Sequence, residues 1–327
     1  MKNLVAGFSK QLREALEIGK QAKLTSSPTD IRNVLICGLG GSGIGGNMVS
    51  ELVALEATVP IEVTKGYFIP AYVNGHTLVI ISSYSGNTEE TLQCMGLALG
   101  KKAKIVCITS GGKVAEIATE KKLDIIFVPG GMPPRSCLGY SMTQLLYILQ
   151  FNGLISKNPV AHIQSAIELI EAEEENIKKE AALISSKLLG KLPVLYATTY
   201  YEGVAIRFRQ QLNENSKVLC WHQVIPEMNH NELVGWREKN ENISVILFRD
   251  RHEYERNNVR IEINKSVILN YTPHITEIWS KGNNIIEKAI YFIHLGDWIS
   301  VDLAEKRGYD ASEINVINAL KSELSKH

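Results

Sequence analysis

The chain has 327 residues, which is enough for about two domains of roughly 150 residues, each with its own hydrophobic core. Apolar residues make up 45% and charged residues 21%, a composition that excludes disordered, fibrous and membrane-embedded proteins. Thirty-five Lys and Arg balance thirty-five Asp and Glu, so no net charge draws the chain to nucleic acid or to anionic lipid. A small molecule is the expected partner.

The five cysteines and the N-terminal residues indicate the cellular compartment in which we expect the protein. The cysteines are odd in number, lie mostly inside apolar runs and lack the close pairing of a metal site. Charges interrupt the apolar positions of the first twenty residues, and no window elsewhere reaches the roughly 18 apolar residues that span a bilayer. We therefore expect a cytoplasmic protein with reduced cysteines, no bound metal, no signal peptide and no membrane anchor.

The first half of the chain reads as alternating strands and helices. Leu4, Phe8, Leu12 and Leu16 are spaced for an amphipathic helix, and a polar stretch over 26–30 ends that segment. The β-branched runs that follow are almost uninterruptedly apolar, which is typical of parallel strands buried on both faces between helices. We expect strands at 33–37, 60–64, 77–82, 104–108 and 124–128, and helices at 43–55 and 89–99.

The same pattern restarts after a charged helical stretch over 163–189, which we interpret as a connector. No repeat period is visible, so any duplication has diverged beyond detection in one sequence. The sequence therefore predicts two α/β domains, over residues 1–152 and 153–327. In the second we expect strands at 192–197, 218–221, 243–248 and 274–279, helices at 204–212 and 286–303, and a last helix at 311–324.

A glycine-rich segment, Gly38–Gly46, lies between the first expected strand and the helix after it. Glycines allow positive φ and close approach of the backbone to a ligand, and a helix N-terminus attracts anions. The segment also matches the GxGxxG pattern of dinucleotide sites. Such a site has an acidic residue at the end of the second strand, where this chain has Lys65, with Glu62 inside the strand. Phosphate binding is favoured, and a nicotinamide-dependent oxidoreductase stays an alternative.

A serine-rich loop follows the expected strand at 77–82 and reads Ser-Tyr-Ser-Gly-Asn-Thr-Glu-Glu-Thr from Ser83 to Thr91. Asn87 or Thr88, followed by two glutamates, would start a helix well. A helix cap needs only one hydroxyl, however, so Ser83 and Ser85 are in surplus. Several hydroxyls together with backbone amides form a neutral cage of donors that suits a phosphate dianion.

This loop resembles the signature of SIS (sugar isomerase) domains, which bind phosphorylated sugars. Taken in order with the other motifs, it is similar to the bifunctional phosphoglucose/phosphomannose isomerase family, a resemblance that spans nearly the whole chain. It implies two SIS-type three-layer αβα domains with mainly parallel sheets, no cofactor, and a homodimer whose active site is shared between subunits. It implies that Gly41, Ser42, Ser83, Ser85 and Thr88 hold the substrate phosphate. The other matching motifs are Gly38–Gly46, Pro133–Ser136, Asn213–Lys217, Pro226–Glu232 and Asp297–Gly308.

The resemblance also implies four catalytic residues, each of which suits aldose–ketose isomerisation. Glu214 would move a proton between C1 and C2 through an enediolate, as a partly desolvated carboxylate can. His230, contributed by the partner subunit, would open the sugar ring, because imidazole titrates near neutral pH. Arg135, after two prolines, would stabilise the enediolate charge. Lys306 would assist ring opening.

One departure from the family bears on substrate choice. Seven residues before Lys306 the family is expected to carry a threonine linked to mannose 6-phosphate, whereas this chain has Ile299 followed by Ser300. We expect the protein to interconvert glucose 6-phosphate and fructose 6-phosphate and to accept mannose 6-phosphate as well, the last activity being lost if Ile299 occupies the position of that threonine. Competing interpretations are a non-catalytic sugar-phosphate sensor and the isomerase part of a glucosamine-6-phosphate synthase. The sensor would need no base, and a sensor's basic DNA-binding segment is not expected in the roughly 30 residues before the first strand.

Overall fold

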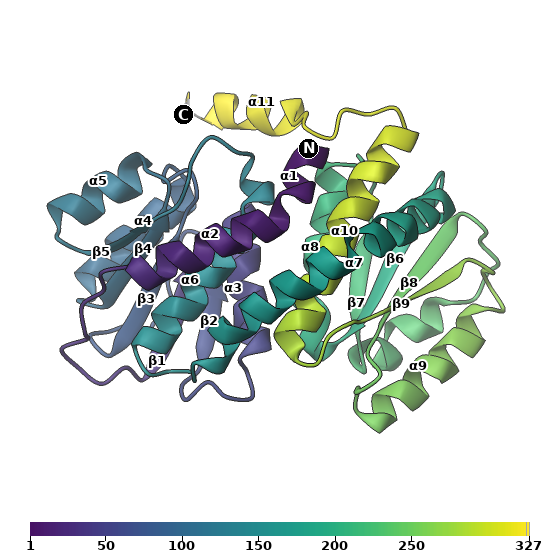
Figure 1. Ribbon diagram of the computed structural model, residues 1–327, viewed down its shortest axis with the longest axis horizontal. Coiled ribbons are helices and arrows are strands. Elements are labelled where there is room, and N and C mark those ends of the chain that lie inside the picture. Colours follow the sequence, from purple (N-terminus) through teal and green to yellow (C-terminus); the bar gives the residue numbers. More distant parts are fainter. Residues whose placement is uncertain (325, 327) are drawn as a thin grey trace. The chain divides into compact units, whose positions relative to one another are not determined.

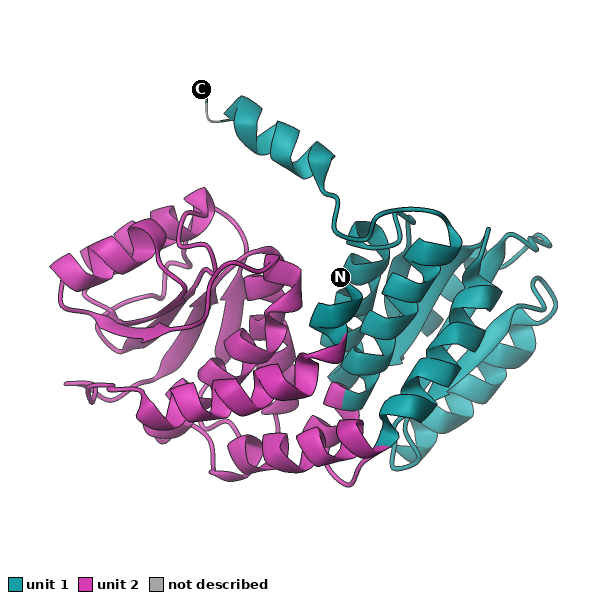
Figure 2. Ribbon diagram, turned by 45° about the horizontal axis from the view of Figure 1, so that its top comes forward, with its two compact units in different colours: residues 1–5, 173–281, 291–327 teal, residues 6–172, 282–290 magenta. Residues whose placement is uncertain are grey.

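The structure is a computed structural model that describes residues 1–324 and 326 (Figure 1). The chain forms two compact units (Figure 2): unit 2 comprises residues 6–172 and 282–290, and unit 1 comprises residues 1–5, 173–281 and the chain from 291 onward. The division falls inside helix α7 (Asn158–Leu188), about twenty residues after the expected boundary at 152/153. The reason is that the connector is one unbroken helix, so the change of unit occurs within it.

Unit 2 is built on a five-stranded parallel sheet. Its strands begin at or within one residue of the expected positions, because each is an apolar run bounded by turn residues. Strand order is β2-β1-β3-β4-β5, with Val34 in register with both Ile61 and Leu78. The strands are β1 (Asn33–Cys37), β2 (Ile61–Thr64), β3 (Thr77–Ser82), β4 (Lys104–Thr109) and β5 (Asp124–Phe127).

Helices cover both faces of this sheet, which confirms the expected three-layer α/β arrangement. Helices α4 (Glu89–Gly100) and α5 (Gly112–Glu120) share one hydrophobic cluster with Leu35 and Val79. Helix α3 (Gly40–Leu52) lies on the opposite face, where a Cβ added at Gly46 would meet the side chain of Ile36 at 2.9 Å. Helix α6 (Leu138–Phe151) packs against α3, and α2 (Phe8–Gln21) packs against α6.

The strand order defines where a ligand can bind. Strand β1 lies between β2 and β3, and the helices that follow β1 and β3 leave to opposite faces of the sheet. The carboxyl ends of β1 and β3 are therefore the topological switch point of this sheet, the place where such folds bind ligands. The order is of the flavodoxin type and differs from the 3-2-1-4-5-6 order of dinucleotide-binding folds. The glycine-rich and serine-rich loops are the two connections at this point.

Unit 1 has a four-stranded parallel sheet in the order β7-β6-β8-β9. Helix α9 (Glu255–Ile268) shares a hydrophobic cluster with Val194 and Leu247. On the other face Phe248 contacts Phe208 of α8 (Glu202–Glu214) and Phe292 of α10 (Ile285–Lys306), with ring centroids 6.1 and 5.1 Å apart. The strands are β6 (Leu192–Thr198), β7 (Trp221–Ile225), β8 (Ile243–Arg249) and β9 (Ile275–Trp279).

The strand expected at 218–221 is wrong by three residues, because β7 begins at Trp221. Lys217 has a positive φ of 56°, and the Asn213 side chain donates to the Val218 carbonyl at 2.7 Å. The two apolar residues before β7 therefore belong to the turn after α8, and Leu219 is 82% exposed. Within the described residues no helix is long and apolar enough to cross a membrane. The remaining elements are α1 (Lys2–Ala6), α11 (Asn315–Leu324) and the 3-10 turns η1 (Pro134–Ser136), η2 (Thr199–Tyr201), η3 (Glu227–His230) and η4 (Glu232–Gly235).

Candidate active site

The serine-rich loop connects β3 to α4 at the switch point. The Ser83 hydroxyl is buried and donates to the Thr88 hydroxyl at 3.3 Å, while Ser85 is exposed and accepts from the Asn87 N–H at 3.3 Å. Thr88 is the N-cap of α4, yet its side chain makes no capping hydrogen bond to the helix within the described chain. The amides of the first helical turn therefore face the loop, as in helix N-termini that bind anions.

The glycine-rich loop meets the serine-rich loop directly. The Ser42 hydroxyl, in the first turn of α3, accepts from the Tyr84 N–H at 3.0 Å and is buried. Gly43 is required for this turn, because a Cβ there would lie 2.3 Å from the Gly38 carbonyl oxygen. Two helix N-termini and their hydroxyls thus converge on one place, and together they supply donors for a phosphate dianion.

Arg135 lies on the turn η1 and is 3% exposed. Gly41 allows α3 to approach this turn, because a Cβ at Gly41 would meet the Pro134 carbonyl oxygen at 2.6 Å. Gly41 and the Arg135 turn are therefore packed against one another in unit 2. The contacts also link Ser42 to Tyr84 of the serine-rich loop and Ser83 to Thr88 within that loop, whereas Ser85 is exposed and contacts Asn87.

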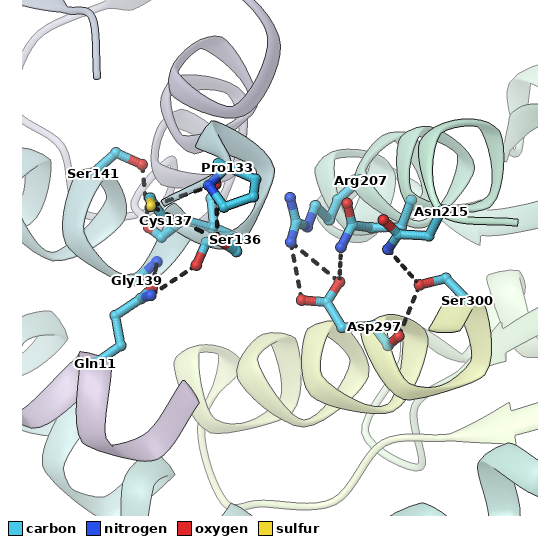
Figure 3. A network of polar contacts seen from close by, with 12 residues as sticks. Gln11, Pro133, Ser136, Cys137, Gly139, Ser141, Arg207, Asn215, Asp297 and Ser300 are labelled. Carbon is cyan, nitrogen blue, oxygen red and sulfur yellow. Dashed lines mark hydrogen bonds and ion pairs between the residues drawn. The ribbon is translucent and has the colours of Figure 1, made fainter. Parts of the chain in front are cut away.

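Gln11 of α2 supports the arginine turn from behind, which the sequence did not reveal. Its side-chain amide donates to the Ser136 carbonyl at 2.7 Å and accepts from the Gly139 N–H at 2.8 Å (Figure 3). Gln11 is 7% exposed. A polar side chain on the apolar face of a predicted amphipathic helix is the signal that could have found it.

Glu214 is the last residue of α8 in unit 1 and is half-buried. Its carbonyl accepts from the Lys217 ammonium at 2.5 Å. The next residue, Asn215, donates to the Ser300 hydroxyl at 2.9 Å, which ties the end of α8 to α10 (Figure 3). The carboxylate is therefore on a segment whose backbone is fixed.

A buried ion pair holds α8 to α10 one turn further away. Arg207 of α8 contacts the Asp297 carboxylate at 2.9 Å, and Gln211 donates to the same carboxylate at 2.8 Å (Figure 3). The side chains of Arg207 and Asp297 are 3% and 9% exposed. In the sequence, Asp297 is only the first residue of a motif. Its pairing with Arg207 could not be predicted, because pairing between distant helices leaves no local pattern.

His230 ends the turn η3 and is exposed. The loop that carries it is fixed by Asn229, which donates to the Asn264 side chain at 2.5 Å. His230 is therefore an exposed residue on a fixed loop, and its role in ring opening stays a prediction.

Lys306 is the last residue of α10 and is surrounded by oxygen atoms of unit 1. Its ammonium donates to the Ala182 carbonyl and to the Ser185 and Ser186 hydroxyls at 2.6–2.8 Å, and it pairs with Asp302 at 2.7 Å. These oxygen atoms compensate the positive charge of the ammonium, so it would have to leave them in order to assist ring opening. Its role in ring opening stays a prediction.

Ile299 and Ser300 are both fully buried within unit 1. The Ser300 hydroxyl donates to the Asp297 carbonyl at 2.7 Å in addition to accepting from Asn215. Side chains in this position can influence substrate choice only through their neighbours, of which Asn215 is next to Glu214. Their effect on mannose 6-phosphate stays a prediction. Over residues 1–324 and 326, no group of three or more His, Cys, Asp or Glu side chains could hold a metal ion.

Together, the doubled α/β fold, the two phosphate-type loops at the switch point and the adjoining arginine define an SIS-type phosphosugar-binding protein. The bacterial phospho-glucose isomerase C-terminal SIS domain matches residues 177–324. The bifunctional phosphoglucose/phosphomannose isomerase of Caldicellulosiruptor bescii is 37% identical over 98% of both chains. The enzyme of the same name from Aquifex aeolicus is 35% identical over 91% of this chain and 92% of its own. The chain belongs to the bifunctional phosphoglucose/phosphomannose isomerase family.

Solved structures bear on the fold alone. The C-terminal domain of glucosamine-fructose-6-phosphate aminotransferase from Francisella tularensis superposes with a TM-score of 0.72 at 14% identity, covering 96% of each chain. The expected pair of SIS-type α/β domains is therefore confirmed.

Proposed function

We propose that this protein interconverts glucose 6-phosphate, fructose 6-phosphate and mannose 6-phosphate, as the names of its relatives state for them. The observation that carries the proposal is the meeting of the glycine-rich and serine-rich loops through Ser42 and Tyr84, beside the buried Arg135. Two helix N-termini suit the phosphate dianion of a phosphorylated sugar. The cation next to them suits the negative charge that develops at the reacting carbons.

In this mechanism the phosphate is anchored first. Ser42, Ser83, Ser85 and Thr88, with the backbone at Gly41, donate to the phosphate oxygens and place the sugar. This binding is equal in the ground state and the transition state, so it sets the affinity rather than the chemical step.

The chemical step uses side chains only, and we propose no cofactor. Glu214 takes the proton from C2 of the open-chain aldose, and O1 takes up the charge of the resulting enediolate. The O2 proton passes to O1, and Glu214 returns its proton to C1, which leaves a carbonyl at C2 and gives the ketose. Arg135 stabilises the enediolate oxygens, where a fixed cation counts most in the transition state. Return of the proton to C2 on either face would give glucose 6-phosphate or mannose 6-phosphate.

Ring opening precedes this transfer. We propose that His230 of the partner subunit, assisted by Lys306, moves the proton between the ring oxygen and the C1 hydroxyl. The working unit would then be a homodimer with two shared sites, located in the cytoplasm. No disulfide joins the five cysteines in the described chain, which is typical of a reducing compartment.

The test is an assay of the purified protein with fructose 6-phosphate, in which glucose 6-phosphate and mannose 6-phosphate are each followed separately. We expect both products, and we expect Glu214→Gln to lower kcat by at least a hundredfold, while Glu241→Gln on an exposed loop leaves it unchanged. Formation of glucose 6-phosphate without mannose 6-phosphate would show that the protein does not act on mannose 6-phosphate. Neither product would overturn the proposal in favour of a sensor, and saturable binding of NAD(H) would favour an oxidoreductase.

A further inference from the structure

Tyr84 occupies the variable position of the serine motif, between two proposed phosphate ligands, and its contacts reach three other segments. Its N–H donates to Ser42 on the glycine-rich loop. Its carbonyl accepts from Ser110, after β4, through both the backbone N–H at 2.9 Å and the hydroxyl at 2.7 Å. These backbone contacts do not depend on the side chain.

The phenol of Tyr84 reaches the turn that carries Arg135. Its oxygen accepts from the Met132 N–H at 3.1 Å, and Tyr84 lines a small cavity together with Cys137. Met132 precedes Arg135 by three residues and Cys137 follows it by two, so the phenol is hydrogen-bonded to one end of the turn and lies beside the other. Cys137 in turn donates to the Pro133 carbonyl at 3.5 Å inside the turn.

The phenol is suited to this place. Burial raises the pKa of Tyr84 to about 12. It therefore stays protonated at neutral pH, with an oxygen that can accept from an amide. The cavity beside it is about 10 Å³, room for about one water molecule, so the two loops are joined by direct contact rather than through solvent.

We propose that Tyr84 is a positioning residue that fixes the Arg135 turn relative to the phosphate-binding loops. The inference rests on the proposed function. A cation contributes most when it is already in place as charge develops, and a displacement of about 1 Å can cost about a hundredfold in rate. Tyr84, whose main chain is part of the phosphate-binding loop, would thus also set the distance between the bound phosphate and Arg135.

The test is the variant Tyr84→Phe, which keeps the ring and all three backbone contacts and removes only the hydroxyl. We expect kcat to fall about 10- to 100-fold, with the KM for fructose 6-phosphate and the inhibition constant of inorganic phosphate within about twofold of wild type. A five-carbon aldonate phosphate, whose carboxylate mimics the enediolate, should bind more weakly in proportion to the fall in kcat.

The matched control is Tyr140→Phe. Tyr140 lines the same small cavity and is 3% exposed, but its hydroxyl donates to Glu14 on α2 at 2.6 Å. We expect its kcat to be unchanged. A folded Tyr84→Phe variant with wild-type kcat, or one in which phosphate and aldonate phosphate weaken equally, would overturn the inference. Absence of isomerase activity in the wild-type protein would overturn the proposed function instead.

Discussion

Ser83 shows how a nearly inaccessible side chain can still belong to a binding site. Its hydroxyl is 2% exposed and contacts only one side chain that the described hydrogen bonds record, Thr88 at the start of α4. The Ser83 hydroxyl has one proton, so it can donate to an anion at the start of α4 once it rotates away from the Thr88 oxygen.

We predict that Ser83→Ala raises the KM for fructose 6-phosphate about 10- to 100-fold and changes kcat by less than about threefold. A hydrogen bond to a charged group contributes about 1.5–3 kcal/mol, and the phosphate is bound equally before and during reaction. Steady-state kinetics measure both constants. Thr119→Ala, on the exposed face of α5, is the control, because its hydroxyl bonds only to the Ala115 carbonyl. A lower kcat at constant KM would contradict the assignment of Ser83 to the phosphate.

Lys306 and Asp302 give a prediction for stability and pH. Burial raises the pKa of Asp302, but the hydrogen bonds from Lys306 and Ser185 outweigh it, so the pKa is lowered from its ordinary value of 3.8. A carboxyl whose pKa is lowered by folding stabilises the folded state at pH values above its pKa in the unfolded chain. This contribution is lost as the pH falls through its pKa in the folded protein.

We therefore predict that Lys306→Met lowers the free energy of unfolding by about 1–2 kcal/mol at pH 7. The difference from wild type should shrink as the pH falls below about 4 and through the lowered pKa of Asp302 in the wild-type protein, because the carboxyl is then protonated in both proteins. Thermal unfolding between pH 3 and pH 7 measures this. A constant difference across that range would refute the ion-pair explanation. A fall in kcat, measured where both proteins are folded, would show a role of the ammonium in ring opening.

At the residue scale the motifs predict a phosphate site in unit 2 but not how its residues are held. The serine and glycine patterns are local, so the sequence alone leads to Ser42 and Ser83 as predicted phosphate ligands. The contacts of Gln11 with Ser136 and of Arg207 with Asp297 join residues about 90 or more positions apart. No spacing rule within one sequence encodes such pairs, because they depend on how the elements pack.

At the scale of the elements, helix α3 and the turn η1 are in close contact. Gly41 and Gly96 offer a matched comparison, since both lie in helices. A Cβ at Gly41 would meet backbone at 2.6 Å, whereas a Cβ at Gly96 on the exposed side of α4 would meet nothing within 4 Å.

We predict that Gly41→Ala lowers the free energy of unfolding by about 1–3 kcal/mol, because a rigid carbonyl must move. It should also lower kcat/KM at least tenfold, because α3 and the Arg135 turn are forced apart. Gly96→Ala should instead stabilise the protein by about 0.5–1 kcal/mol through its helix propensity, with unchanged kinetics. Chemical denaturation and steady-state assays measure these effects. Equal behaviour of the two variants would show that the close approach is unimportant.

The positions of helices and strands were predictable where one spacing of apolar residues dominates the segment. Strands β1, β3 and β4 are apolar on both faces and bounded by turns, so their limits followed from the sequence. The predicted strand at 218–221 failed because its apolar residues fill a turn after α8, and β7 instead begins with Trp221 and continues through the polar His222 and Gln223. Helix α9 has apolar residues on several sides and no clear stripe, which is why its limits were not predicted.

For the whole molecule, the proposed shared active site predicts complementation between inactive subunits. Equal amounts of Glu214→Gln and His230→Ala subunits, unfolded together and refolded, should form about half heterodimers, each with one intact site. We expect about a quarter of the wild-type activity to return. Each variant refolded alone is the control. Recovery of no activity, with heterodimers shown by native mass spectrometry, would mean that Glu214 and His230 act within one subunit.

Both sheets place their first strand between the second and the third, as β2-β1-β3 in one unit and β7-β6-β8 in the other. The two units therefore repeat one topology but differ at corresponding loops. Where unit 2 has serines after β3, unit 1 has Asp250 and Glu253 after β8, and Tyr201 donates to Asp250 at 2.8 Å. Carboxylates repel a phosphate, so of these two corresponding loops it is the one in unit 2 that suits an anion.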